Sequence, residues 1–160
     1  MNNLLDKFED SIDNLNKTEY FSQKSIELKQ ILLSDEVTQK ILISLDKFER
    51  NQKFCDSNLT LTSLAKELNT NNKYLSKIIN LHKQKSFTQY IHDLRINYFI
   101  DHLKEEKSKY RSYNIKGIAD DLGFKTSRSF STAFHKKMNR YPSDYIKEIK
   151  IKKESSFDQI

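Results

Sequence analysis

Proline, glycine and cysteine are all scarce in this sequence. Its 160 residues include one proline and two glycines, although tight hairpin turns depend on glycine and on other residues that accept unusual backbone angles. This scarcity disfavours a sheet-rich fold with many chain reversals, and it excludes proline- or glycine-rich disorder. Ten phenylalanines and eight tyrosines are available for a core. We therefore expect an all-α fold.

Long apolar segments are also missing. No apolar run approaches the roughly 20 residues that span a bilayer, and the N-terminal residues lack the basic start and apolar stretch of a signal peptide. Cys55 is the only cysteine, which rules out an intrachain disulfide and favours a reducing compartment. The sequence thus predicts a cytoplasmic protein without a membrane partner.

Charge is distributed unevenly along the chain. The net charge is +6, from 28 basic and 22 acidic residues. Residues 1–58 carry 8 basic and 11 acidic side chains, whereas residues 59–160 carry 20 basic and 11 acidic ones. A basic segment behind an acidic leader indicates a polyanionic partner, although the solvation of lysine-rich helices explains the same balance. Net charge alone leaves both interpretations open.

A helix-turn-helix pattern occurs twice after residue 58. Residues 64–69 align with residues 118–123, and each segment is a short amphipathic pattern that ends at an Asn or a Gly, residues that tolerate positive φ. After one extra residue in the second copy, Leu75, Ser76 and Ile79 align with Phe130, Ser131 and Phe134. Two copies are too few for a solenoid, but they are the right number for two helix-turn-helix units. Apolar side chains at helical spacing predict one long helix over residues 86–106 between the two units.

The second helix of each unit presents a face without acidic residues. In the first unit, helical periodicity places Leu75, Ile79 and His82 on the inner side and polar side chains on the outer side. Residues 71–85 and 125–140 contain no Asp or Glu. An ordinary solvated helix mixes acids with bases, so an acid-free face that arises twice favours contact with phosphates.

Short motifs between residues 61 and 145 form a recognisable series. They are Leu61-Thr62-Ser63-Leu64-Ala65, Tyr74-Leu75-Ser76, Leu94-Arg95, Ile118-Ala119-Asp120-Asp121-Leu122-Gly123-Phe124, Ser129-Phe130-Ser131-x-x-Phe134 and Tyr141-Pro142-Ser143-x-Tyr145. Together they resemble the AraC/XylS-type DNA-binding domain over about residues 35–149, with a Leu-Asn-Thr-Asn and Tyr-Leu-Ser pattern similar to its Bacteroidetes-like branch. The resemblance implies a homeodomain-like architecture of two helix-turn-helix units joined by a long helix. It also implies that each unit places a recognition helix in one of two successive major-groove segments.

The resemblance implies a set of residues that contact double-stranded DNA. The candidates for base contacts are Lys73, Ser76, Lys77, Ser127, Arg128, Ser131 and Thr132. The candidates for phosphate contacts are Asn72, Asn80, Lys83 and Lys136, together with the helix starts near Thr60 and Asn114. No catalytic residue, metal or cofactor is implied.

The expected organisation has three parts. These are a helical leader or remnant linker over residues 1–34, an AraC-type DNA-binding domain over residues 35–150, and a frayed tail over residues 151–160. Within the domain we expect a first helix-turn-helix at 59–83, a linker helix at 86–106, a second helix-turn-helix at 114–138 and a last helix at 142–150. Three departures from the family pattern stand out. Asn69 and Asn139 occupy positions that are often glycine, and Ile100 occupies a position that is commonly alanine. The stretch 104–114 is longer than in the shortest members, which leaves the angle between the two units open.

The sequence also bears on functions other than DNA binding. The four histidines lack helical i, i+4 pairing and a carboxylate cluster, and the sequence has no glycine-rich phosphate loop, so we expect no enzyme activity. A helical module that binds RNA polymerase or another regulator is the alternative to a sequence-specific DNA-binding transcription regulator. A steep salt dependence of binding would distinguish DNA from an apolar protein partner. The leader either packs on the domain or pairs with a second chain, so a homodimer through residues 1–50 is a candidate assembly.

Overall fold

The computed structural model describes residues 35–105 and 107–157, with side chains as far as residue 152. These residues form α-helices and two short 3-10 helices, and no strand occurs among them. The prediction of an all-α fold is therefore confirmed. The chain divides into two compact parts between Leu42 and Ile43, and the account below concerns the second part. The helices expected in the leader over residues 1–34 lie outside the described residues.

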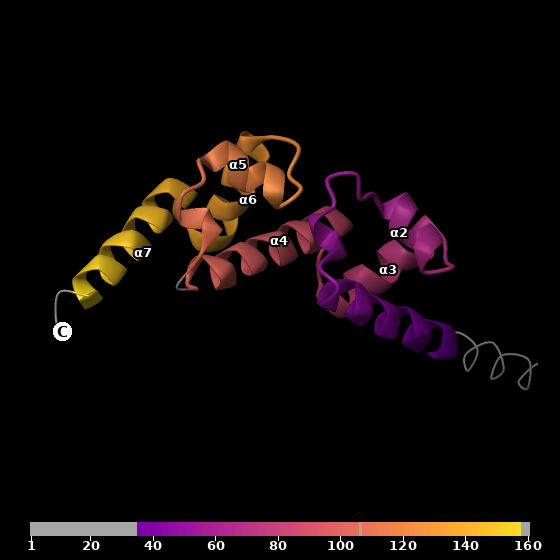
Figure 1. Ribbon diagram of the computed structural model, residues 1–160. Coiled ribbons are helices and arrows are strands. Elements are labelled where there is room, and N and C mark those ends of the chain that lie inside the picture. Colours follow the sequence, from indigo (N-terminus) through magenta and orange to yellow (C-terminus); the bar gives the residue numbers. More distant parts are fainter. Residues whose placement is uncertain (1–34, 106, 158–160) are drawn as a thin grey trace, which may run out of the picture. The chain divides into compact units, whose positions relative to one another are not determined.

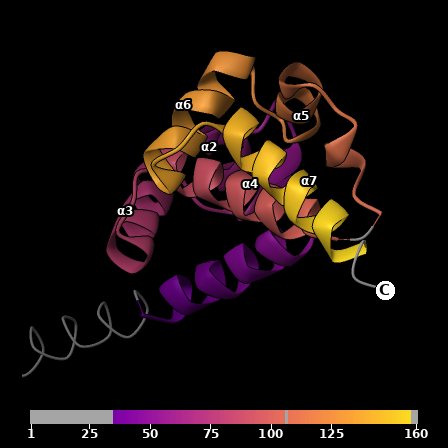
Figure 2. The same ribbon diagram turned by 90° about the vertical axis from the view of Figure 1, so that its left-hand side faces the viewer.

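A helix over residues 35–50 opens the described chain. The elements that follow it are η1 (Lys53–Cys55), α2 (Leu61–Glu67), α3 (Asn72–Lys83), α4 (Phe87–Leu103), η2 (Lys109–Arg111), α5 (Ile115–Asp121), α6 (Ser127–Met138) and α7 (Pro142–Phe157). Figure 1 shows α2 and α3 at one end of α4, with α5 and α6 toward its other end. The helices α5 and α6 lie next to each other in Figure 2 as well.

The two helix-turn-helix units start their helices in the same way. The side chains of Asn71 and Thr126 accept hydrogen bonds from the backbone three residues ahead and so cap α3 and α6. A side-chain oxygen at this position accepts a hydrogen bond from a backbone N–H that the first helical turn leaves without a partner. Asn69 and Gly123 have φ values of 52° and 78° in the two turns. The predicted positive-φ turns are thereby confirmed in both copies.

The long helix α4 contributes to the packing of both units. Near its start, Tyr90 and Ile91 are buried, and α4 packs against α3 there. Near its end, Phe99 is fully buried and meets Phe130 and Phe134 of α6 edge to face, with ring centroids 5.6 and 5.9 Å apart. Such aromatic pairs add to the stabilisation that apolar burial gives. The helix that the sequence predicted as a linker is therefore also a core element of the second unit.

Two helix ends differ from the predicted ones. The linker helix was expected over 86–106, but α4 ends at Leu103, and residue 106 lies outside the described residues. Arg111 donates hydrogen bonds to the carbonyls of Leu103 and Glu105, which satisfies acceptors that a longer helix would have used internally. Because Arg111 lies outside the helix, helical periodicity could not locate the end of α4.

The last helix is longer than predicted, and the expected frayed tail is wrong for residues 151–157. Instead of ending at residue 150, α7 continues to Phe157. Glu148 pairs with Lys152 one turn later and with Arg140 before the helix, at 2.6 Å each. An i, i+4 ion pair on an exposed helix favours the helical backbone, and here it supports extension of the helix beyond residue 150.

The longer stretch between α4 and α5 is packed into the second unit. Within it, η2 buries Tyr110 completely, and its ring meets Phe99 edge to face at 5.2 Å. The Tyr110 hydroxyl donates a hydrogen bond to Asp121 at 2.6 Å, and Lys109 contacts the other oxygen of the same carboxylate at 2.8 Å. The additional residues thus supply a core side chain to the second unit.

None of the helices in the part of the chain that the structure describes combines the length and apolar character needed to cross a membrane.

Candidate nucleic-acid interface

The first candidate recognition helix, α3, has a buried side and a polar side. Leu75, Ile78 and Ile79 are buried, while Lys73 and Lys77 are exposed. Of the remaining candidates on this helix, Ser76 is half-buried and Asn72 and Asn80 are exposed. One prediction for this helix was wrong, because His82 is exposed rather than on the inner side. It lies in the last turn, beyond the turn that packs against the core.

The second candidate recognition helix, α6, has the same two sides. Phe130 and Phe134 are fully buried, and Arg128 and Thr132 are exposed. Ser127 and Ser131 are half-buried, and Lys136 is exposed. The structure thus brings each set of base-contact candidates together on one face of its own helix, as the aligned repeats predict.

Two of the phosphate candidates already have partners within the protein. The Asn72 side-chain amide donates a hydrogen bond to the Thr62 hydroxyl at 2.8 Å, which joins the start of α3 to α2. Lys83 is half-buried and pairs with Glu49 at 2.8 Å. The Tyr90 hydroxyl donates to the same Glu49 oxygen, also at 2.8 Å. Lys83 therefore has a structural role that its position at the end of α3 did not reveal, whereas Lys136 makes no such contact among the described residues.

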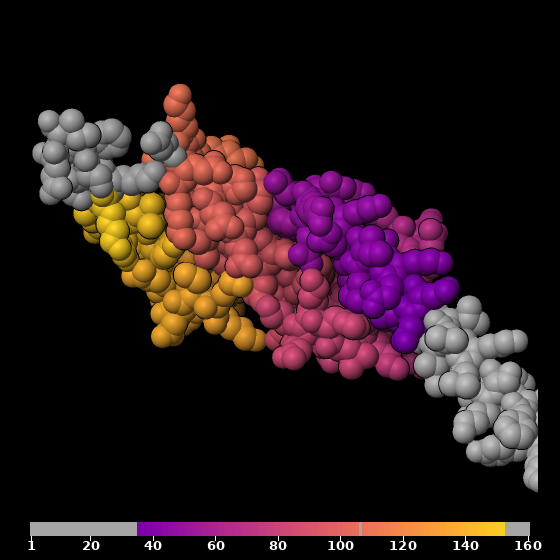
Figure 3. All heavy atoms as spheres, turned by 90° about the horizontal axis from the view of Figure 1, so that it is seen from below, coloured from indigo at the N-terminus to yellow at the C-terminus, as the bar shows by residue number. Residues whose placement is uncertain are grey.

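A groove of about 700 Å³ lies between the loop after α3, the start of α4 and the outer side of α6. The residues that line it include Gln84, Lys85, Gln89, Asp93, Arg128 and Lys136. Figure 3 shows atoms of the α3–α4 region and of α6 side by side at its lower edge. Two of the base and phosphate candidates, Arg128 and Lys136, therefore share this groove with residues of the loop and of α4 that the sequence did not single out.

Asp93 is the acidic side chain in the groove. Its carboxylate contacts Lys85 at 2.5 Å through one oxygen and Lys137 at 3.5 Å through the other. Partial burial alone would raise the pKa of Asp93, but the hydrogen bond from Lys85 and the charge of Lys137 outweigh it and hold the pKa below its ordinary value. Asp93 is therefore ionised at neutral pH and bridges the loop after α3 to α6.

Arg95 makes a second connection, two residues further along α4. This side chain is 6% exposed and donates hydrogen bonds to the carbonyls of Phe54 at 2.6 Å and Asp56 at 2.9 Å. Its guanidinium also lies 5.3 Å from the centre of the Phe124 ring, in the turn before α6. Arg95 therefore joins the segment that contains η1 to the second helix-turn-helix.

A smaller recess of about 500 Å³ borders the exposed side of α6. Its lining includes Arg128, Thr132, His135 and Tyr141. Tyr141 is 58% exposed, and its ring lies 4.7 Å from that of His135. An exposed aromatic side chain beside base-contact candidates adds a polar and apolar surface to this face. The sequence motif containing Tyr141 gave no indication of this position, because the motif only marked the start of α7.

Metal-binding clusters are missing from the described residues, in which no group of three or more His, Cys, Asp or Glu side chains could hold a metal ion.

Comparisons with known proteins agree with this geometry. Residues 64–148, more than half of the chain, match the family described as a helix-turn-helix domain. The chain is 32% identical over 97 residues to the Msm operon regulatory protein of Streptococcus mutans, a match that covers 58% of this chain and 32% of that protein. The chain therefore spans about a third of the length of this curated relative.

Solved structures with a similar fold include domains of two regulatory proteins. The C-terminal domain of AraT, a response regulator from Geobacillus stearothermophilus, is 31% identical, with a TM-score of 0.51 and coverage of 72% of this chain and 84% of that one. The DNA-binding domain of AdpA, solved in complex with a target DNA, is 13% identical, with a TM-score of 0.54 and coverage of 72% and 94%. At that identity it shows a shared fold. The chain belongs to the AraC/XylS-type family of helix-turn-helix transcription regulators.

Proposed function

We propose that the chain binds double-stranded DNA in a sequence-specific manner by inserting α3 and α6 into successive segments of the major groove. The observation that carries this proposal is the duplicated polar face, which is free of acidic residues over 71–85 and again over 125–140. Two helices of this kind, each held by a buried apolar side, are suited to a polyanion. Half-site centres should then lie about one helical turn apart, roughly 10 bp.

The side chains on the two faces have distinct proposed roles. Lys73 and Arg128 occupy equivalent positions in the two copies, and both can donate hydrogen bonds to guanine in the major groove. Ser76 and Ser131 are a second equivalent pair, suited to base edges or phosphates. Lys77, Ser127 and Thr132 complete the base-contact set.

Phosphate contacts would fix the register of the protein on DNA. Lys136 and Asn80 are suited to them because their side chains are exposed, whereas the exposed Asn72 already uses one of its two amide N–H groups on Thr62. Lys83 would need to leave Glu49 to reach a phosphate, so we propose a smaller contribution from it.

We further propose a DNA-binding domain over residues 35–150, with a last helix that continues past residue 150. RNA polymerase and a second copy of the chain, paired through residues 1–50, are the further candidate partners, and the proposed location is cytoplasmic.

Selection from a library of random DNA duplexes at physiological salt tests the proposal. We expect the full chain to enrich a motif with two half-sites. Enrichment of no motif would contradict sequence-specific binding.

Two substitutions separate base contacts from phosphate contacts. Arg128→Ala should weaken binding to the selected site by about 1–3 kcal/mol and relax the preference at one base position. Lys136→Ala should instead weaken binding to all sequences alike and reduce the slope of log K against log salt concentration by about 0.9. Binding constants measured over a range of salt concentrations check both.

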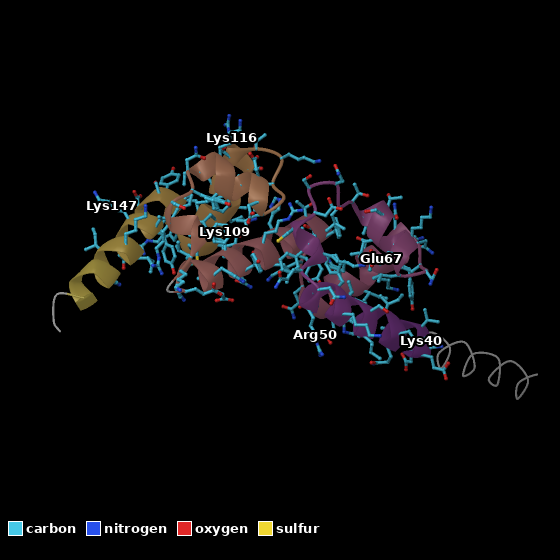
Figure 4. The ribbon with its side chains drawn as sticks, in the orientation of Figure 1. Lys40, Arg50, Glu67, Lys109, Lys116 and Lys147 are labelled. Atoms are coloured by element: carbon cyan, nitrogen blue, oxygen red, sulfur yellow. The ribbon has the colours of Figure 1, made fainter. Side chains whose placement is uncertain are left out.

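Lys147→Ala is the matched control for this pair. Lys147 is an exposed lysine of α7 (Figure 4), outside both recognition faces. Its substitution should leave both the motif and the salt slope unchanged. If Arg128→Ala bound the selected site as well as the unmodified chain, the role given to Arg128 would be wrong.

A further inference from the structure

The charge pattern of the groove between the loop after α3, the start of α4 and α6 contains one exception. Of the described residues that line the groove, Lys85, Arg128, Lys136 and Lys137 are basic, and Asp93 alone is acidic. A carboxylate beside a surface that binds DNA repels phosphates and lowers affinity. Its presence there points to a role that affinity does not explain.

The contacts of Asp93 connect three elements. Lys85 belongs to the loop directly after α3, Asp93 to the first half of α4 and Lys137 to the last turn of α6. Each carboxylate oxygen faces a different lysine, at 2.5 Å for Lys85 and 3.5 Å for Lys137. A carboxylate held in this way restrains the end of one candidate recognition helix relative to the other.

The connection through Arg95 lies on a different side of α4. Residues two apart on a helix point about 200° away from each other, so Asp93 and Arg95 project from nearly opposite sides. Arg95 holds η1 and the turn before α6, whereas Asp93 holds the groove side, where the loop after α3 faces the exposed side of α6. With connections on opposite sides of α4, the two helix-turn-helix units resist a rotation about α4 that a single connection would permit.

We propose that Asp93 is a positioning residue that sets the separation of α3 and α6 and thereby the spacing between DNA half-sites that the protein accepts. The inference rests on the proposed function, because half-site spacing has a meaning only if both helices bind DNA. Asp93 contacts no base in this proposal. It restricts which DNA sites fit, at some expense of affinity for DNA in general.

The test compares half-site spacing preferences of the full chain and of Asp93→Asn. The DNA probes carry the two selected half-sites at the preferred spacing and at spacings one or two base pairs shorter and longer. Each added base pair moves a half-site by about 3.4 Å and about 35° around the duplex, so the unmodified chain should lose affinity steeply. In Asp93→Asn we expect this loss to shrink by about three- to tenfold, while affinity for unrelated DNA rises because a negative charge is gone.

Three comparisons separate positioning from a general structural effect. Asp93→Glu keeps the negative charge, so this variant should keep the spacing preference of the unmodified chain. Asp101→Asn removes an exposed carboxylate of the same helix that takes part in no ion pair among the described residues, and it should keep the spacing preference of the unmodified chain. The thermal unfolding midpoint of Asp93→Asn reports any loss of stability separately.

The outcomes are distinguishable. If the unmodified chain selects no motif, the proposed function fails and the role of Asp93 fails with it. If it selects two half-sites but Asp93→Asn keeps the same steep spacing dependence, or loses affinity equally at every spacing, the role of Asp93 is overturned while DNA binding stands. A spacing preference that is relaxed in Asp93→Asn and retained in Asp93→Glu supports the proposal.

Discussion

Asp121 shows how one carboxylate holds the additional loop against the second helix-turn-helix. Burial alone would raise its pKa, but hydrogen bonds from Lys109 and Tyr110 outweigh burial and hold the pKa of Asp121 below its ordinary value of 3.8. Figure 4 labels Lys109, which contributes from η2. A depressed folded-state pKa means that the stabilisation is present above the unfolded-state value and is lost as the pH falls through the folded-state value.

Asp121→Asn should therefore destabilise the protein in a pH-dependent way. We expect the free energy of unfolding to fall by about 1–2 kcal/mol at about pH 7, because the amide loses the charge-assisted contact with Lys109. The difference should shrink as the pH is lowered below about 4, where the unmodified chain also loses the charge. Urea unfolding followed by circular dichroism at several pH values measures both.

The neighbouring residue offers a matched control. Asp120 is exposed in the same turn of α5, and Asp120→Asn should change stability little at either pH. An equal effect of Asp121→Asn at neutral and acidic pH would contradict the role given to its charge.

The turns of the two helix-turn-helix units differ in length and in what surrounds them, since four residues separate α2 from α3 and five separate α5 from α6. Both contain a residue with positive φ, Asn69 at 52° and Gly123 at 78°. Asn69 is exposed, whereas a Cβ on Gly123 would lie 2.3 Å from the carbonyl oxygen of Cys55. The first turn thus requires only a residue that tolerates positive φ, whereas the second also requires a residue without a side chain.

Substitutions in the two turns should differ in size for this reason. Asn69→Ala should cost about 1 kcal/mol, since alanine accepts a left-handed backbone less readily, while Asn69→Gly should be nearly neutral. Gly123→Ala should cost about 3 kcal/mol or more, because the new methyl group meets backbone that cannot move aside. Urea unfolding gives the three values.

Asn97→Ala serves as the reference for these turn variants. Asn97 is exposed within α4, so its replacement by alanine should be neutral or slightly stabilising. Equal costs for Asn69→Ala and Gly123→Ala would show that the close approach to Cys55 contributes nothing.

Local sequence was a good guide to where helices begin and a poor guide to where they end. The caps Asn71 and Thr126 act through hydrogen bonds only three residues long, so the sequence around them is sufficient. The end of α4 depends on Arg111, and the length of α7 depends in part on the contacts of Glu148. Both helix ends depend on residues outside the helix, Arg111 after α4 and Arg140 before α7, and helical periodicity does not detect such contacts.

At the scale of the whole described domain, Arg95 joins the segment upstream of the first helix-turn-helix to the turn of the second one. Burial lowers the pKa of Arg95 from its ordinary value, a change that the nearby Cys55 and Asp56 partly oppose. The guanidinium is nevertheless charged at neutral pH, because arginine keeps its proton under all ordinary conditions. Its two carbonyl partners would lose a donor if it were removed.

Arg95→Leu should therefore weaken the folded protein as a whole. We expect a loss of about 2–4 kcal/mol in the free energy of unfolding, from two carbonyls left without their donor and from the lost contact with Phe124. The two helix-turn-helix units should also unfold less cooperatively, so that circular dichroism and tyrosine fluorescence no longer give one transition.

A leucine at an exposed position of the same helix, Asn97→Leu, is the control for added apolar surface. A single transition with unchanged midpoint in Arg95→Leu would contradict the connecting role of Arg95.

The composition of the candidate site could be predicted from the sequence, but its assembly could not. Helical periodicity and the duplication were enough to identify Lys73 and Arg128 as exposed and equivalent. Asp93 and Lys85 escaped notice because their significance depends on Lys137, which is more than forty residues away along the chain. Lys83 was assigned a role without its partner Glu49 for the same reason.

The approach of Gly123 to Cys55 has a consequence for where this domain begins. The helix-turn-helix family match starts at residue 64, yet the second turn, far downstream, rests against η1, upstream of that match. Arg95 takes both of its carbonyl acceptors from the same upstream segment. The smallest fragment able to fold as an intact domain should thus start no later than Lys53, and a boundary drawn from the recognition motif alone would cut away the surface that supports its second half.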